Sequence, residues 1–209
     1  RKFIYNSSLA SLSVMGLNSC NLSSKNLKIT ILHTNDVHSQ IEPFPSNHNL
    51  YPNKGGFARR ANLINETINL NPNTLIFDAG DIFQGTPYFN FFKGDLELGL
   101  MKKMGYNAAT IGNHEFDAGL KTLKQNIINN NFQFISSNYD FTNTELEGLV
   151  DEYKIYKKEG VKVGVFGLGI ELKGLVNPLL SKETKYNDPL DIAKDMTSKL
   201  KFEKGCDLI

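Results

Sequence analysis

Cysteine is scarce in this 209-residue sequence, which contains only Cys20 and Cys206. Two cysteines are too few for a disulfide framework. They also lie in stretches of different composition, so we expect no structural bond between them. A hydrophobic fraction of 40% and an aromatic fraction of 11% are sufficient for a core and exclude wholesale disorder. The length fits one large domain or part of a larger protein.

An excess of charge of one sign is also lacking. The chain has 23 Lys and Arg residues, 22 Asp and Glu residues and a formal net charge of +1. Without a basic excess, the chain has little to displace the counterions of a phosphate backbone, so we expect no nucleic-acid partner. Any phosphate chemistry must therefore come from a local site. Internal repeats and low-complexity linkers are absent from the sequence as well.

The first 26 residues differ in character from the rest. A basic start at residues 1–2 and a moderately apolar stretch over 3–17 precede polar residues at 21–26, which is the order of a secretory signal peptide and a short linker. The apolar stretch is too short to span a bilayer as a mature helix, and no other segment is long and apolar enough. Residues 17–20, Leu-Asn-Ser-Cys, resemble a bacterial lipoprotein cleavage box. The alternative is an ordinary leader with an incidental cysteine.

These features predict export to the bacterial cell envelope. The protein would lie in the periplasm or be anchored to the membrane by a lipid on Cys20. We expect no other membrane contact.

From residue 27 onward, the sequence predicts alternating strands and helices, as in an α/β protein. A hairpin follows, with strands over residues 152–157 and 161–167. A later helix has Asp188 as its N-cap and Pro189 at its first position. An apolar strand begins at residue 207, where the sequence stops, so we expect a longer parent chain. The earlier strands are predicted over residues 28–33, 74–77, 108–111 and 133–136, and the helices over 57–68, over 96–104 and around Leu120, Leu123, Ile127 and Ile128, which share one side.

Polar clusters follow the first three of these strands. Functional loops of α/β proteins lie beyond the carboxyl ends of the strands, so these clusters are expected to meet. Their occurrence at three successive strand ends is the main indication of function. They are Asp36-x-His38, Gly80-Asp81 and Gly112-Asn113-His114-Glu115-Phe116-Asp117.

The first two clusters each have an ordinary explanation. Asp36 and His38 project the same way from an extended chain and can share an ion, but Asp-x-His also occurs by chance in loops. Asp81 has two carboxylate oxygens that can bridge two cations. It can equally cap a turn between Gly80 and Gly85, where glycine allows close approach of the backbone.

The third cluster offers both ligands and acid–base groups. Asn113 provides a neutral oxygen. Asp117 lies three residues after His114 and can accept a hydrogen bond from one ring nitrogen, which orients the imidazole. The ordinary explanation is a helix N-terminus with Asn113 as cap and Glu115 and Asp117 in the first turn. That explanation leaves His114 without a role.

Together, the three clusters indicate a metal centre, because three separate coincidences would otherwise be needed. A mixture of carboxylate, imidazole and amide ligands suits zinc, manganese or iron rather than calcium. Two such ions about 3.5–4 Å apart polarise a phosphoryl group and generate hydroxide at neutral pH. The developing charge then needs a nearby donor, and His114 is placed for that role.

The clusters, in this order, resemble the signature of the calcineurin-like metallophosphoesterase superfamily. From about residue 28 to the end, the surroundings resemble its 5′-nucleotidase family. The resemblance implies a four-layer α/β/β/α sandwich that is incomplete at its C-terminal end. The residues that carry it are Asp36-x-His38, Gly55-Gly56, Asp78-Ala79-Gly80-Asp81-x-x-Gln84-Gly85 and Ile111 through Asp117.

The same resemblance implies roles for individual residues. It implies two divalent metal ions (zinc, manganese or iron), with Asp36 and His38 on one ion, Asp81 bridging both and Asn113 on the second. It further implies that His114 and Asp117 form the catalytic pair, and that metal-bound hydroxide is the nucleophile.

The sequence departs from the family after His114. The family completes its metal shell with later histidines, whereas the remaining two here, His33 and His48, lie upstream; we expect a structural role for His33. The family's carboxyl-terminal nucleotide-binding domain is also missing. Residues 27–209 are therefore predicted to be the N-terminal portion of the metallophosphoesterase domain. We expect this chain alone to bind metal weakly, which leaves open whether it is active.

The predicted function is hydrolysis of phosphate esters, with nucleoside 5′-monophosphates as small-molecule substrates. Alternatives are a 2′,3′-cyclic-nucleotide phosphodiesterase, a UDP-sugar hydrolase or a thiosulfohydrolase-like relative. A non-catalytic exported lipoprotein is a further alternative, which the His114–Asp117 pair disfavours. Arg59 and Arg60 are predicted to form a solvated helix face, with a phosphate contact as the alternative. The aromatic residues between Phe83 and Phe92 are predicted to pack in the core or a domain interface rather than stack on a base.

Overall fold

The computed structural model describes residues 26–209 of the chain. The predicted signal peptide and the lipidation site at Cys20 lie outside the described residues. Cys206 is buried and has a free thiol. No helix within residues 26–209 has both the length and the apolar character that a bilayer-spanning helix needs.

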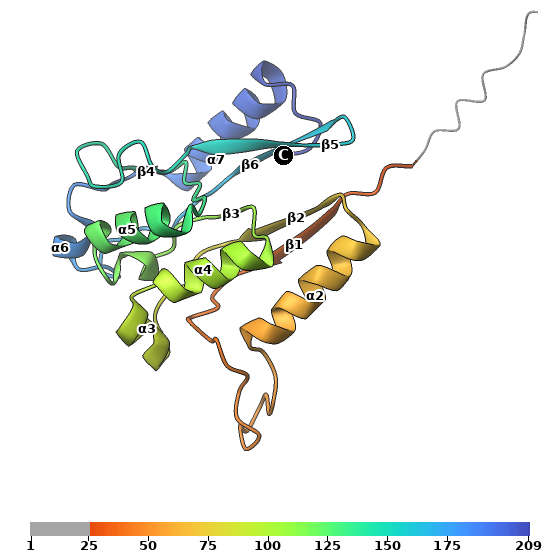
Figure 1. Ribbon diagram of the computed structural model, residues 1–209. Helices are drawn as coiled ribbons and strands as arrows, with labels where there is room; N and C mark the ends of the chain where they lie inside the picture. Colours follow the sequence, from red (N-terminus) through yellow and green to blue (C-terminus); the bar gives the residue numbers. More distant parts are fainter. Residues whose placement is uncertain (1–25) are drawn as a thin grey trace, which may run out of the picture.

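A parallel sheet forms the centre of the fold (Figure 1). Its strands lie side by side in chain order: β1 (Thr30–Thr34), β2 (Thr74–Asp78) and β3 (Ala108–Ala109). Beyond β3, the sheet continues as isolated parallel bridges, which join Ala109 to Phe134 and Ile135 to Asp151. The first three predicted strands are confirmed, although β3 is shorter than expected. The predicted strand over residues 133–136 is present only as these bridges.

Helices cover one face of the parallel sheet (Figure 1). They are α2 (Phe57–Leu70), α3 (Pro87–Phe92), α4 (Asp95–Met104) and α5 (Leu120–Asn130). The core lies between these helices and the sheet, and includes the buried side chains of Ile64 and Leu98. On α5, three of the four predicted apolar residues are buried, but Ile128 is 55% exposed. Its placement on the buried side is wrong, because it lies about 100° around the helix from Ile127.

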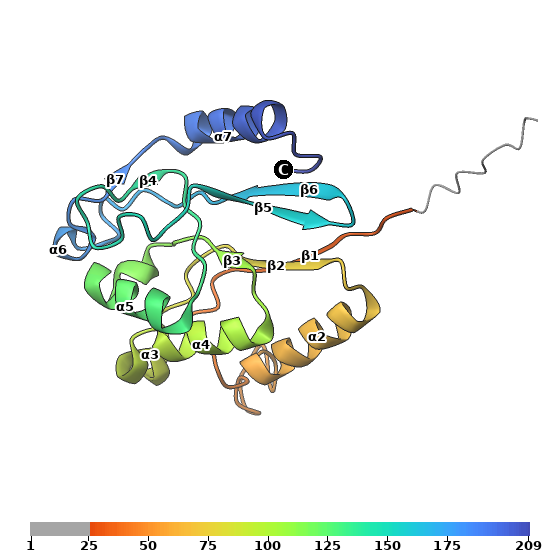
Figure 2. The ribbon, with the colours of Figure 1, turned by 45° about the horizontal axis from the view of Figure 1, so that its top comes forward.

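A second, antiparallel layer lies on the opposite face of the sheet (Figure 2). It is the predicted hairpin of β5 (Tyr153–Lys158) and β6 (Val161–Phe166). Glu159 and Gly160 form its turn with φ of 46° and 91°. Positive φ at both turn positions matches the twist of the flanking strands. Helix α7 (Pro189–Ser198) lies outside the hairpin. Helices, parallel sheet, hairpin and α7 are thus the four layers of the predicted α/β/β/α sandwich, which confirms that fold.

The start of α7 is fixed as predicted. The Asp188 side chain accepts hydrogen bonds from the backbone N–H groups of Leu190 at 2.8 Å and Asp191 at 3.3 Å. Near the end of the chain, Leu208 forms a parallel bridge to Val163 of β6. The predicted final strand is therefore a single bridge beside the hairpin.

Several short elements were not predicted. Strands of two residues show no detectable alternation, and single helical turns show no 3.6-residue period. They are β4 (Tyr139–Asp140), which pairs antiparallel with β7 (Lys185–Tyr186), α6 (Pro178–Ser181), the 3₁₀ turn η1 (His114–Phe116) and the π-helical turn η2 (Lys199–Glu203).

A chain of polar side chains ties α2 to the carboxyl end of the sheet. Thr34 Oγ1 donates to Asp78 Oδ2 at 2.5 Å and lies 2.8 Å from the Tyr106 hydroxyl, which also accepts a bond from Arg60 at 3.2 Å. The Arg60 guanidinium also lies 3.9 Å from the centroid of the Phe57 ring, at the start of α2. The prediction of a solvated helix face is therefore wrong for Arg60, whereas Arg59 is exposed.

This polar chain predicts a pH dependence of stability. Burial raises the pKa of Asp78 from 3.8 to about 6, and hydrogen bonds from Thr34 and Gly80 oppose it only in part. As the pH rises, the unfolded state therefore loses this proton first, and stability falls between about pH 4 and pH 6. A difference of about two pKa units corresponds to roughly 3 kcal/mol.

The substitution Asp78→Asn keeps an acceptor for Gly80 and removes the titration. We expect the variant to lose less unfolding free energy between pH 4 and pH 7 than the parent, as measured by urea unfolding at both values. Asp195→Asn, a change at an exposed acid of α7, serves as control. Identical losses in parent and Asp78→Asn would contradict the prediction.

Candidate metal centre

The loops after β1 and β2 remain paired beyond the ends of their strands. The backbone N–H of Asp36 donates to the carbonyl of Gly80 at 3.0 Å, and that of His38 donates to the carbonyl of Asp81 at 3.1 Å. Because these bonds continue the strand pairing, Asp36 and His38 are held beside Asp81. The first two polar clusters therefore lie side by side, as predicted.

The same loops have a strained backbone. A positive φ in a residue other than glycine costs about 1–3 kcal/mol and persists where surrounding contacts fix it, often at functional sites. Gly85 contributes to this packing, because a Cβ atom there would lie 2.7 Å from the carbonyl oxygen of His38. The strained residues, with φ between 43° and 68°, are Asp36, His38, Ser39, Asp81 and Gln84.

The fully buried carboxylate of Glu115 joins the loop after β2 to the loop after β3. Its Oε1 accepts the N–H groups of Ile82 at 2.7 Å and Phe83 at 3.3 Å, and its Oε2 accepts those of Asp81 at 3.0 Å and Gly112 at 2.6 Å. Burial raises the pKa of Glu115 to about 7, although these N–H groups oppose the rise. From the sequence, Glu115 was expected only as an acid in a first helical turn. Its actual role depends on contacts more than 30 residues away, which leave no local pattern.

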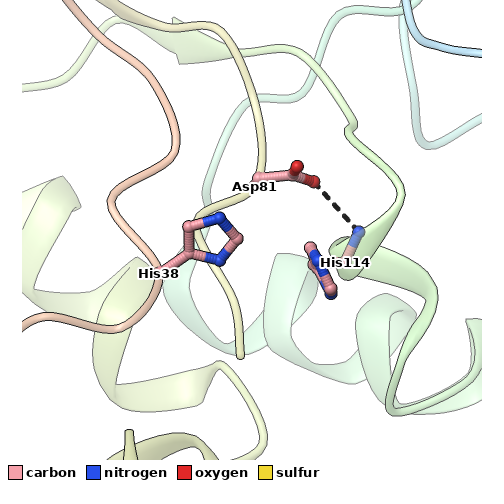
Figure 3. A group of neighbouring side chains, drawn as sticks. All are labelled: His38, Asp81 and His114. Carbon is pink, nitrogen blue, oxygen red and sulfur yellow. Dashed lines mark hydrogen bonds between the residues drawn. The ribbon is translucent and has the colours of Figure 1, made fainter. Parts of the chain in front are cut away.

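His38, Asp81 and His114 converge on one space from the loops after β1, β2 and β3 (Figure 3). Their candidate ligand atoms lie within 4.8 Å of one another. The His114 backbone N–H donates to Asp81 Oδ1 at 3.0 Å, and the two imidazole centroids are 5.1 Å apart. Gly112 leaves room for the Asp81 carboxylate, because a Cβ atom there would lie 2.2 Å from Oδ1.

The other two predicted ligands adjoin this group. Asp36 Oδ1 is 3.8 Å from His38 Nε2. Asn113 lies between two residues whose N–H groups are both bonded to carboxylates of the site. Imidazole nitrogens and carboxylate oxygens in one place fit zinc, manganese or iron. The structure thus brings the predicted residues together, and their assignment as ligands stays a prediction.

His114 and Asp117 form the contact expected of the predicted catalytic pair. Nδ1 of His114 lies 2.8 Å from Asp117 Oδ2. Partial burial disfavours the charged imidazolium, but the bond to Asp117, together with the nearby charges of Asp81 and Glu115, outweighs it and raises the pKa of His114. The turn η1 makes this possible, because it places residues three apart on the same side.

A cavity of about 560 Å³ adjoins the candidate centre. Asp36 and His38 line it, together with Arg59 and Arg60 from the start of α2. Exposed Arg59 therefore borders the space next to the predicted ligands, which keeps a phosphate contact open as its role. His33 lines a different cavity, of about 270 Å³, between the two sheets. Its predicted structural role is compatible with that position.

The aromatic stretch divides into buried and exposed residues. Phe83 and Phe89 are in the core, with their ring centroids 5.6 Å apart. Phe91 is 82% and Phe92 48% exposed, and with Tyr88 they line a second cavity, of about 820 Å³. The prediction of core packing is therefore wrong for Phe91 and Phe92, whereas their packing against a further domain stays a prediction.

Comparisons with known proteins agree with this geometry. Residues 29–200 match the model of the calcineurin-like phosphoesterase family. A snake venom 5′-nucleotidase from Gloydius brevicauda is 36% identical over 176 residues, which cover 81% of this chain and 29% of the relative.

Two solved structures are similar as well. The 5′-nucleotidase precursor from Thermus thermophilus has a TM-score of 0.78 and 33% identity, with coverage of 86% of this chain and 35% of that one. The NAD nucleotidase from Haemophilus influenzae has a TM-score of 0.72 and 29% identity, with coverage of 87% and 33%. The chain thus spans about a third of the length of these relatives.

The contact between His114 and Asp117 predicts an effect on titration. Asp117→Asn removes the carboxylate charge that favours the imidazolium, so we expect the pKa of His114 to fall. NMR titration of the histidine ring signals measures this value, with His114→Gln to assign the signal. Asp191→Asn, a change at an exposed residue of α7, should leave it unchanged. An unaltered or raised pKa in Asp117→Asn would show that the pair does not interact as described.

Proposed function

Because the chain belongs to the calcineurin-like phosphoesterase family, we propose that the protein containing it hydrolyses phosphate esters of nucleotides, with nucleoside 5′-monophosphates as its main substrates. The convergence of His38, Asp81 and His114 from three separate loops is the observation that carries this proposal. The names of the venom enzyme and of the Thermus thermophilus protein support the choice of substrate.

In this proposal, the ligands are the four predicted from the sequence. Asp36 and His38 would hold one divalent cation, Asn113 would hold a second, and Asp81 would be shared by both. When bound, two such cations polarise the phosphoryl group and lower the pKa of water to near neutrality. The rigid pairing between the loops after β1 and β2 fixes the separation of the ligands before metal or substrate arrives.

His114 acts on the charge that develops on the ester. Asp117 accepts the bond from Nδ1, so Nε2 faces away from Asp117 and donates to a phosphoryl or leaving-group oxygen. The raised pKa of His114 increases the fraction of imidazolium at neutral pH. Asp117 keeps the ring in the orientation in which this proton is available.

Two other classes of function are weaker candidates. Cyclic-nucleotide phosphodiesterases and UDP-sugar hydrolases would use the same centre, and the difference would lie in a substrate domain outside residues 26–209. A non-catalytic binding protein would have no use for an imidazole oriented by a carboxylate. We also propose export, with lipid attachment at Cys20. The signal-peptide order of residues 1–26 supports export, and the lipoprotein-like box supports the lipid.

Phosphate release by the full-length, metal-loaded protein tests the proposed function. AMP should be hydrolysed faster than cyclic nucleotides or UDP-glucose. His114→Ala should lower kcat by about 10²–10⁴-fold, the usual contribution of a positioned acid. Asp81→Ala should lose both bound metal and turnover, whereas Asp195→Ala, a change at an exposed residue of α7, should match the parent. Full turnover together with retained metal in Asp81→Ala would refute the mechanism.

A further inference from the structure

Glu97 is a fully buried carboxyl group outside the predicted metal centre. It lies on α4, on the same buried face as Leu98 and Met101. Among residues 26–209, no Lys, Arg or His forms an ion pair with it. Its Oε2 has no hydrogen-bond partner among the described residues. A carboxyl group buried in this way is unfavourable for folding, so its presence requires another explanation.

Within residues 26–209, Ser39 is the one side chain that bonds to Glu97, and it directly follows His38. Ser39 Oγ donates a short hydrogen bond to Glu97 Oε1. Thr86 Oγ1 in turn donates to Ser39, with distances of 2.8 Å to the carbonyl oxygen and 2.9 Å to Oγ. Ser39 is fully buried and has a φ of 54°. A single carboxyl group thus fixes a strained residue next to a predicted ligand.

This network connects three separate parts of the chain. Ser39 belongs to the loop after β1, Thr86 belongs to the loop after β2, and Glu97 belongs to α4. The backbone N–H of Ser39 also donates to the carbonyl of Ile82 at 2.7 Å. The two loops carry His38 and Asp81, so the network ties together the two segments that supply these side chains.

We propose that Glu97 is a positioning residue of the metal centre, which acts through Ser39 and Thr86 to hold His38 in the orientation that binds a cation. This inference rests on the proposed function. Glu97 itself touches neither the cation nor the substrate. It fixes the backbone on the C-terminal side of His38, and the close packing of the His38 carbonyl against Gly85 fixes that backbone further.

A purely structural role and a positioning role predict different results. Replacement of Glu97 by leucine leaves the buried Ser39 hydroxyl without its acceptor, which destabilises the fold. A purely structural role therefore predicts a lower melting temperature for Glu97→Leu with unchanged metal affinity. If Glu97 positions His38, the same substitution should weaken metal binding, because residues that orient metal ligands typically contribute 10–100-fold to affinity.

Mn²⁺ binding to the full-length protein tests the proposal, by calorimetry and by electron paramagnetic resonance of the free ion. We expect Glu97→Leu and Ser39→Ala each to weaken Mn²⁺ affinity by about 10–100-fold. Glu97→Gln keeps an oxygen that accepts the Ser39 bond and should restore most of the affinity. Asn126→Leu is the matched control, because Asn126 is a buried polar residue of α5 that bonds to the carbonyl of Lys93. It should bind Mn²⁺ like the parent.

Parental Mn²⁺ affinity in Glu97→Leu would overturn the proposal. If Glu97→Leu does not fold, Ser39→Ala decides in the same way, since it removes the hydroxyl and leaves the core carboxyl in place. A parent that binds no Mn²⁺ would also overturn it. The proposed function fails separately, if a parent that binds Mn²⁺ releases no phosphate from any nucleotide ester.

Discussion

The candidate site depends on the hydrogen bonds that the Glu115 carboxylate accepts. This carboxylate accepts four backbone N–H groups from two loops. Hydrogen bonds to a charged acceptor are about twice as strong as neutral ones. Without this acceptor, the N–H groups of Asp81 and Gly112 would lose their hydrogen bonds within a partly buried region. The position of Asp81 relative to His114 therefore follows from a residue that has no chemical role of its own.

Around this acceptor, the fold places polar groups and strain together. The parallel order of β1, β2 and β3 brings three loops to one edge of the sheet, and backbone pairing continues beyond the strands into the loops. Five residues other than glycine adopt positive φ there. Glu97 is buried with one oxygen that has no hydrogen-bond partner within residues 26–209, which is a further departure from an ideal core. Such departures gather at functional sites, because ligand geometry and folding stability make different demands.

Features with a local or periodic basis were predictable from the sequence. The hairpin turn at Glu159-Gly160 and the cap at Asp188 each rest on residues adjacent in the chain. The strand ends before the polar clusters were visible because β-branched runs stop abruptly at glycine and aspartate. Glu115 and Glu97 were not predictable, because three of the four partners of Glu115 and the Ser39 partner of Glu97 lie more than 30 residues away. Burial depends in the same way on tertiary contacts, which explains the errors at Ile128 and Arg60.

We propose that three loops hold a pair of cations around the Asp81 carboxylate. Anomalous diffraction from crystals of the full-length protein soaked in Mn²⁺ tests it most directly. We expect two peaks, about 3.5–4 Å apart, on either side of Asp81, with Asp36 and His38 next to one and Asn113 next to the other. A single peak, or peaks remote from Asp81, would contradict it.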